Sequence, residues 1–338
     1  MERKTNIVKS SSLFFSCCFI LLGQLLFSQN SWKLINQTLN SRVPAPLAKE
    51  NYFELLDSKA SFLFSTSKND SFEILLPNEN GKEELFLLKP VALLSPSLSK
   101  KYISIKTFKG KSVKRPNVKV RMSTHPNGIN AWIQLEGKED LFIQPVKGKK
   151  KVHFVYQKIK NDKALDFYCK TILQTNQTKG ERITQKSTPV FSELRTFRIA
   201  IAGTAEYTNF WGDNDFSNGS NAEDAFGAVV SSLNRISQVF EDEVGVRLEL
   251  VSDASLMYED AENDPFSEDV QAELQKTLDE VLGDEAYDVG HLFDYGEPNG
   301  DAGCIGCVCQ TNQKGQGFST HPFEDTYGGE FRNDYFDL

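Results

Sequence analysis

Three cysteines near the C-terminal end of the chain have the residue type and spacing best suited to chemistry. They lie in the stretch Cys304-Ile-Gly-Cys-Val-Cys309. Closely spaced thiolates can bind zinc or copper. A four-ligand site would also need His291, which precedes the stretch, or His321, which follows it, and the sequence gives no reason for either to join. A metal centre here is therefore not the favoured interpretation.

Disulfide formation is the better interpretation of these cysteines, because bridges are common in exported proteins. We predict a disulfide that involves Cys304 or Cys309. Cys304 and Cys307 lie so close in sequence that a bridge between them cannot be inferred without the loop conformation. Cys169 either completes an even set of four or stays free.

Several enzyme classes are not expected, because the sequence lacks the motifs that define them. The four histidines are spread over the chain at His125, His153, His291 and His321, and no two are four residues apart. We interpret His125, in a turn, and His153, in a strand, as surface or packing residues. The chain has no Walker lysine motif, no Gly-x-Ser-x-Gly elbow and no glycine-rich dinucleotide turn after a strand. Nucleotide binding and serine hydrolysis are therefore not expected.

Charge divides the chain into two unequal parts. Residues 1–195 carry 32 Lys and Arg against 16 Asp and Glu, whereas residues 196–338 carry 6 against 30. Opposite charges within one chain attract over about 8 Å at physiological ionic strength. We predict intramolecular docking of the basic N-terminal part on the acidic C-terminal part, although independently solvated surfaces are the alternative. No nucleic-acid partner is expected, because the lysines follow no known recognition module.

The first 29 residues have the pattern of a signal peptide. Arg3, Lys4 and Lys9 precede an apolar run over residues 11–27, and Ser28 offers a small residue at a cleavage point. We expect a secreted protein. The alternative is a membrane anchor, because the apolar run is longer than usual for a cleaved segment.

Residues 30–173 predict a β-rich domain, and residues 174–193 predict a linker. Six short segments alternate apolar and polar residues with a period near two, and turn residues such as Pro126-Asn-Gly128 separate them. The Thr, Gln, Lys and Ser content of the following stretch is typical of an exposed linker.

Residues 194–338 predict a parallel sheet covered by helices. A strand at 196–202 precedes a helix over 221–243, which has apolar residues every three or four positions and a capping-box pair, Ser220 and Glu223. A strand at 246–251, a helix from about Ser267 to Gly283 and a strand at 287–293 follow. This β-α-β-α-β order favours right-handed crossovers.

Several of these segments resemble secreted bacterial metalloproteases of the reprolysin (adamalysin-like) branch of the metzincins. The matching segments are Phe197-Arg-Ile-Ala-Ile-Ala-Gly-Thr-Ala-Glu-Tyr207, Tyr287-Asp-Val-Gly-His-Leu-Phe293 and the glycine- and cysteine-rich residues 303–317. The resemblance implies an α+β two-domain chain, in which a β-rich prodomain precedes an incomplete zincin-type α/β domain with an added edge strand. It also implies a zinc metalloendopeptidase precursor that acts on protein or peptide substrates.

The catalytic motif of that family, His-Glu-x-x-His-x-x-Gly-x-x-His, is not present in this sequence. The resemblance implies that catalytic and zinc-binding residues would lie beyond Leu338, that residues 333–338 lead toward their helix, and that this chain is a truncated, inactive form. Gly315, Gly317 and Phe318 are the candidate edge of the substrate cleft. Cys169 is a candidate cysteine switch, a propeptide thiolate that would occupy the zinc of a latent enzyme.

Two alternatives remain open at this stage. The alternative function is that of a non-enzymatic secreted binding protein, in which the basic and acidic parts hold each other or an outside protein. Calcium is a further cofactor candidate, because the acidic part has many carboxylates, but no loop shows alternating ligand spacing.

Overall fold

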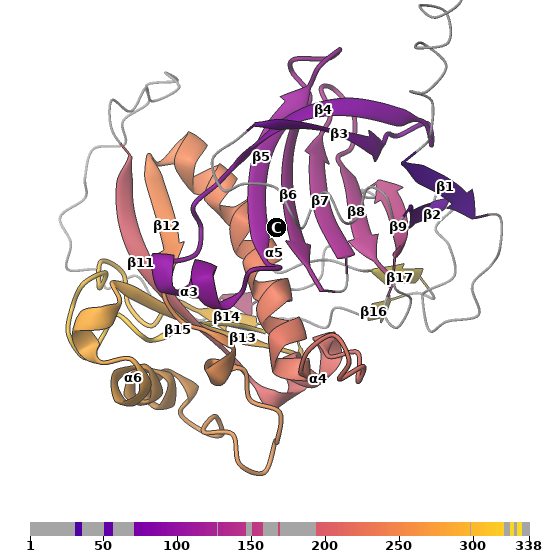
Figure 1. The fold of residues 1–338 in the computed structure, drawn as a ribbon. Coiled ribbons are helices and arrows are strands. Elements are labelled where there is room, and N and C mark those ends of the chain that lie inside the picture. The colour runs from indigo at the N-terminus through magenta and orange to yellow at the C-terminus, as the bar shows by residue number, and fades with distance from the viewer. Residues whose placement is uncertain are drawn as a thin grey trace, which may run out of the picture.

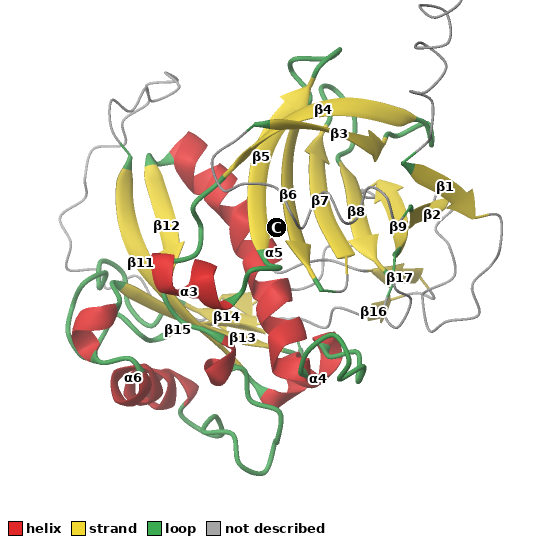
Figure 2. Ribbon diagram, viewed as in Figure 1, coloured by secondary structure: helices red, strands yellow, loops and turns green. Residues whose placement is uncertain are grey.

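The computed structural model describes residues 31–35, 51–56, 71–126, 128–146, 151–157, 168–169, 194–297, 299–320, 325–327 and 330–332. It is a mixed α/β structure with a nine-stranded sheet, a six-stranded sheet and a few helices, as Figures 1 and 2 show. The expected signal peptide, the linker and the segment 333–338 lie outside these residues. No helix in the described ranges is long and apolar enough to cross a membrane.

The nine-stranded sheet is antiparallel and has the order β1-β2-β9-β8-β7-β6-β5-β4-β3. Its strands are β1 (Trp32–Ile35), β2 (Asn51–Leu55), β3 (Phe72–Pro77), β4 (Glu83–Pro90), β5 (Lys106–Ser112), β6 (Lys119–His125), β7 (Gly128–Gln134), β8 (Leu141–Pro145) and β9 (Val152–Gln157). The alternating segments predicted from the sequence account for most of these strands. Buried and more exposed residues alternate along β4, because side chains point to opposite faces of a sheet, whereas β6 to β9 are buried on both faces.

The two outermost strands of this sheet approach each other. The indole Nε1 of Trp32, on β1, donates to the carbonyl of Leu75, on β3, over 2.7 Å. The backbone N–H of Trp32 donates to the carboxylate of Glu83, which begins β4. The sheet therefore curls around its apolar core, which includes Phe86, Phe108 and Met122.

The six-stranded sheet has the order β10-β14-β15-β13-β11-β12. Its strands are β10 (Tyr168–Cys169), β11 (Arg195–Gly203), β12 (Val246–Leu250), β13 (Val289–Asp294), β14 (Asn299–Asp301) and β15 (Gly317–Thr320). β11, β12, β13 and β15 are parallel to one another, whereas β14 is antiparallel to β15. β10 pairs with β14 in parallel. A separate two-stranded pair joins β16 (Asp325–Tyr327) and β17 (Glu330–Arg332).

Helix α5 (Asn221–Glu243) has the bounds predicted from the sequence. The capping box is present: the Ser220 side chain accepts from the N–H of Glu223, whose carboxylate accepts from the N–H of Ser220. Its apolar face, with Phe226, Val229 and Leu233, packs on the core of the six-stranded sheet. Its polar face packs on the nine-stranded sheet, so α5 runs between the two sheets (Figure 1).

The remaining helices are shorter. α4 (Ala205–Trp211) follows β11, with Thr204 as its N-cap. α6 (Val270–Val281) starts three residues after the predicted Ser267, because the Asp269 side chain caps it by accepting from the N–H of Ala272. Two 3₁₀ turns, η1 (Ala254–Leu256) and η2 (Asp284–Ala286), precede α6 and β13 respectively. The predicted β-α-β-α-β order is observed here, with α4 as an addition.

A segment between β4 and β5 leaves the nine-stranded sheet and contacts the other one. This strap, residues 91–105, contains α3 (Pro96–Lys101), a helix that the sequence pattern did not predict. Leu94 forms a parallel β-bridge with Leu250 at the end of β12. Several strap side chains belong to the core of the six-stranded sheet: Leu93, Leu94, Leu98, Tyr102 and Ile105.

Candidate functional site

The edge of the six-stranded sheet that carries β14 is the candidate functional site. β14 lies between β15 and β10, and the backbone of Tyr168 and Cys169 pairs with Asn299 and Gly300. A two-residue segment from the N-terminal part of the chain therefore covers this edge. Extended peptides bind proteins by adding a strand to such an edge, since its backbone N–H and C=O groups need partners.

The predicted cleft residues lie just inside this edge. Gly317 and Phe318 are on β15, which pairs with β13 on one side and β14 on the other. Gly315 precedes β15, and its N–H donates to Gln275 on α6 over 2.7 Å. Gly317 and Phe318 are thus on an inner strand of the described sheet, and β14 and β10 lie farther out.

Close packing around β13 requires glycine at two positions, Gly290 and Gly317. A Cβ at Gly290, on β13, would overlap Cδ1 of Leu278 and lie 2.8 Å from the Cα of Gly315. A Cβ at Gly317 would lie 2.8 Å from Nδ1 of His291. The glycines that gave the sequence its resemblance therefore let α6 and β15 approach β13 closely.

The cysteine loop between β14 and β15 contains a disulfide that involves Cys304, one of the two cysteines named from the sequence. The structure pairs Cys304 with Cys307, with a Cα–Cα distance of 5.9 Å, and Cys309 is a free, exposed thiol. A bridge between Cys304 and Cys309 is thus not formed. The chain can close the shorter ring because Gly306 has a φ of 84°, which reverses the backbone between the two cysteines. The backbone N–H of Cys309 donates to the carbonyl of Asp288, which fixes the chain after the bridge.

A polar network attaches the end of this loop to α6 and η2. The Lys314 ammonium forms an ion pair with Asp284 over 3.0 Å, and this pair lowers the pKa of the Asp284 carboxyl. The Tyr287 hydroxyl donates to Asp279 over 2.8 Å and accepts from Gln275. Burial, followed by the neighbouring Asp279 carboxylate, raises the pKa of Tyr287, so this phenol stays neutral and acts structurally.

The described histidines do not gather into a metal site. His153 is fully buried on β9: its Nε2 accepts from the N–H of Ile129, and its Nδ1 contacts the carbonyl of Lys151, so the ring is neutral. His125 is buried at the end of β6 rather than in an open turn. His291, on β13, shares a hydrogen bond of 2.9 Å with Ser319. Burial lowers the pKa of each ring to about 4.

No group of three or more His, Cys, Asp or Glu side chains that could hold a metal ion occurs in the described part of the chain. His321 lies outside it. The described residues therefore do not provide the ligands of a zinc centre, and no catalytic step through zinc is assigned to them.

Three polar side chains meet at the C-terminal ends of the parallel strands. Asp294, the last residue of β13, accepts from the Thr204 hydroxyl over 2.7 Å and from the Thr320 hydroxyl over 3.0 Å. This cluster joins the ends of β11, β13 and β15, and each hydroxyl satisfies one carboxylate oxygen. It was not predicted, although polar residues directly after three strands were a visible signal.

The contact between α5 and the nine-stranded sheet contains an unexpected buried charge. Arg121, on β6, donates to Gln238 and Glu241 on α5 over 2.8 and 3.0 Å. Glu241 also receives Lys109 from β5 over 2.7 Å and Arg247 from β12 over 3.3 Å. Burial alone would raise the pKa of Glu241, but the hydrogen bond from Lys109 and the Arg121 charge outweigh it, so the pKa lies below its ordinary value.

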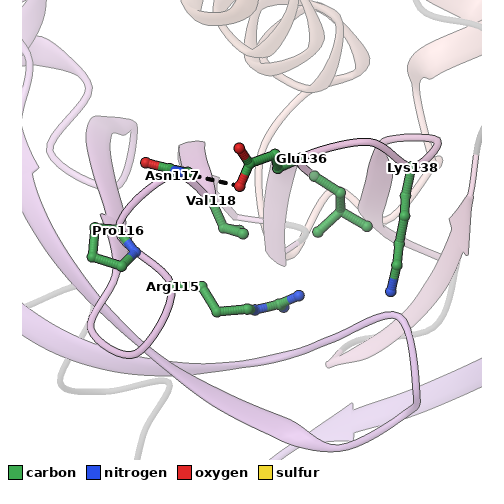
Figure 3. A pocket seen from close by; sticks show the side chains of 7 residues that line it. Arg115, Pro116, Asn117, Val118, Glu136 and Lys138 are labelled. Atoms are coloured by element: carbon green, nitrogen blue, oxygen red, sulfur yellow. Dashed lines mark hydrogen bonds between the residues drawn. The ribbon is translucent and has the colours of Figure 1, made fainter.

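A pocket of about 320 Å³ lies on the nine-stranded sheet, away from β14. Figure 3 shows Asn117 and Glu136 joined across it by a hydrogen bond of 3.0 Å. The Arg115 guanidinium at its rim contacts Glu79 and Glu84, and it holds the pKa of Glu79 at about 2. Both cations that line the pocket, Arg115 and Lys138, thus already have carboxylate partners.

Residues 194–333 match the protein-family model described as Metallo-peptidase family M12B Reprolysin-like. This range contains β11 to β15 and α4 to α6, and it agrees with the resemblance noted from the sequence. The match indicates a metallopeptidase relationship, and metallopeptidases of this family generally use zinc and act on proteins or peptides. None of the curated proteins compared with the chain matches it.

Proposed function

We propose that this chain is a precursor-type relative of secreted zinc metalloendopeptidases. In this proposal residues 194–338 form the sheet-bearing N-terminal part of a reprolysin-like domain, and residues 30–173 form a propeptide-like domain. Residues 174–193 link them, and residues 1–29 direct export. The observation that carries the proposal is the family match over 194–333, on a sheet in which β14 runs antiparallel to β15 near one edge.

The proposed role of β14 is to bind an extended peptide. Its outer side is paired with β10, so a segment of the propeptide-like region occupies the place that a peptide strand would take. Such pairing suits a latent state, because a peptide cannot pair with the backbone of β14 while β10 occupies the same groups. Cys169 belongs to this segment, which supports its proposed role as a cysteine switch.

The chain by itself is proposed to lack peptidase activity. The 338-residue sequence contains no His-Glu-x-x-His pair, and the described histidines lie on three different strands, His125 and His153 buried and His291 half-buried. Without the zinc ligands and the glutamate that activates water, the attacking nucleophile is missing. The activity of the family is therefore proposed for a protein that contains this motif, and peptide binding is proposed for this chain.

Peptide binding at β14 can be tested with two substitutions at one position. Cys169→Pro removes a backbone N–H from β10, and Cys169→Ser keeps the backbone while removing the thiol. A fluorescent, casein-derived peptide is titrated into each variant. We expect Cys169→Pro to bind it at least about tenfold more tightly than the unsubstituted chain, because the edge is freed. Equal binding by all three proteins contradicts the proposal.

The serine variant separates the role of the strand from that of the thiol. If Cys169→Ser behaves like the unsubstituted chain, β10 blocks the edge through its backbone. The competing function, a non-enzymatic secreted binding protein, is favoured by the missing zinc motif. It gains if a protein partner is bound tightly without β10 being displaced.

A further inference from the structure

The strap, residues 91–105, completes the apolar core of the six-stranded sheet. Leu93 is only 1% exposed, and Leu98 and Tyr102 are each 6% exposed. The Tyr102 ring lies 4.7 Å from the ring of Phe226 on α5. These side chains come from the N-terminal part of the chain, yet their neighbours are residues of the C-terminal part. Each part therefore covers apolar surface that the other would expose to water.

The backbone of the strap also covers the second edge of this sheet. The N–H of Leu250, on β12, donates to the carbonyl of Leu93 over 2.8 Å, and the N–H of Ser95 donates to the carbonyl of Leu250 over 3.0 Å. The strap and β10 thus cover opposite edges of the same sheet: the strap pairs with β12, and β10 pairs with β14. Loss of the strap would leave β12 with unpaired backbone groups.

The contact between α5 and β6 is buried as well as polar. The Ser123 and Ser231 hydroxyls are 2.8 Å apart, and the Asn234 amide donates to the carbonyl of Met122 over 2.9 Å. Salt screens such buried contacts much less than it screens exposed ion pairs. Exposed pairs are also present, such as Lys119 with Asp242, but they contribute little to binding.

From these contacts we propose that the two parts of the chain stay bound to each other after the chain is cut between them, and that the strap is the principal anchor. The partner that fits the apolar surface beside β12 is this chain's own segment 91–105. This inference is independent of the proposed peptidase relationship, because it concerns only the contact between the two parts. A cut within 174–193 would by itself not remove the N-terminal part.

The test uses the full chain with a site-specific protease sequence placed within residues 174–193. The cut protein is analysed by gel filtration at about 0.15 M and about 1 M salt, where the Debye length falls from about 8 Å to about 3 Å. We expect both fragments to elute together at both salt concentrations. Elution as two separate fragments at either concentration overturns the proposal, and separation only at high salt indicates docking by surface charge.

A matched pair of substitutions tests the role of the strap. Leu98→Ala removes a buried side chain, whereas Ile103→Ala changes a side chain that is 70% exposed in the same segment. After cutting, Leu98→Ala is expected to weaken association by roughly 30-fold or more, and Ile103→Ala by less than about threefold. Equal effects would overturn the assignment of the strap as anchor. The result for the unsubstituted cut chain stands even if Leu98→Ala fails to fold.

Discussion

The guanidinium of Arg121, on β6, lies 3.0 Å from the carboxylate of Glu241, on α5, and their side chains are only 1% and 6% exposed. The partners are unequal, since Glu241 also contacts Lys109 and Arg247, whereas Arg121 otherwise donates to the neutral side chains of Gln238 and Asn234. Glu241→Gln therefore leaves a buried cation without its counter-charge. We expect it to lower the free energy of unfolding by roughly 3–5 kcal/mol.

Arg121→Met is the informative comparison, because Glu241 keeps two cations after this change. We expect a smaller loss of about 1–3 kcal/mol in urea denaturation. Lys119→Met, which affects an exposed pair, serves as control and is expected to change the free energy of unfolding by under about 1 kcal/mol. A larger loss for Arg121→Met than for Glu241→Gln would contradict the asymmetry.

Stability is expected to fall as the pH is lowered from about 6.5 to about 4. His125, His153 and His291 have folded-state pKa values of about 4, below the ordinary 6.5, because they are buried. Between these values the unfolded chain binds the protons and the folded chain does not, so acid favours unfolding. Above pH 6.5 this contribution is fully present. Glu241 adds a further loss below about pH 4.5, since its pKa is lowered in the folded state.

His153→Gln tests this pH dependence at one residue. The slope of the unfolding free energy against pH, measured by urea denaturation between pH 4 and 6.5, is expected to decrease by roughly one third, because one of three similar histidines is removed. An unchanged slope would show that the pKa of His153 is not lowered in the folded protein.

Gly290→Ala is expected to destabilise the sheet near β14 by about 1–3 kcal/mol, because the new methyl group would overlap Leu278 and approach the Gly315 backbone. Thermal unfolding of the single variant and of the double variant with Leu278→Ala forms a double-mutant cycle. The cost of Gly290→Ala should be smaller when Leu278 is already truncated. Additive effects would argue against the close contact.

Cys309 is expected to be the reactive thiol of the cysteine loop. Iodoacetamide applied to the folded, unreduced protein should modify Cys309, while peptide mapping by mass spectrometry should find Cys304 linked to Cys307. In Cys309→Ser the loop peptide should stay unmodified. A bridge between Cys304 and Cys309, with Cys307 modified instead, would contradict the pairing in the structure.

Local patterns in the sequence predicted α5 well, but they did not reveal what covers it. Apolar spacing and the Ser220–Glu223 capping box fixed its bounds, because both signals are contained within the helix. Its polar face, with Ser231 and Asn234, resembles a solvated surface, yet the nine-stranded sheet buries it. Conversely, Phe240 continues the apolar spacing of the helix but is 40% exposed near its C-terminal end.

Contacts between distant segments account for most of what the sequence left open. The strap meets β12 about 150 residues later in the chain, as Leu94 and Leu250 show, and no local pattern encodes that partner. Arg121 occupies an ordinary alternating strand position, so its buried role depends on α5. The Cys304–Cys307 bridge depends on the backbone turn at Gly306. By contrast, the β-α-β-α-β order followed directly from periodicity and turn residues.

The central proposal is that this chain has a peptidase-type sheet without peptidase chemistry of its own. The most direct test is cleavage of casein by the purified chain, cut and uncut in its linker, with added zinc and with or without a chelator. The account predicts no chelator-sensitive cleavage in either form. Casein hydrolysis that zinc supports and the chelator abolishes would contradict it, because the chain would then hold a working metal site.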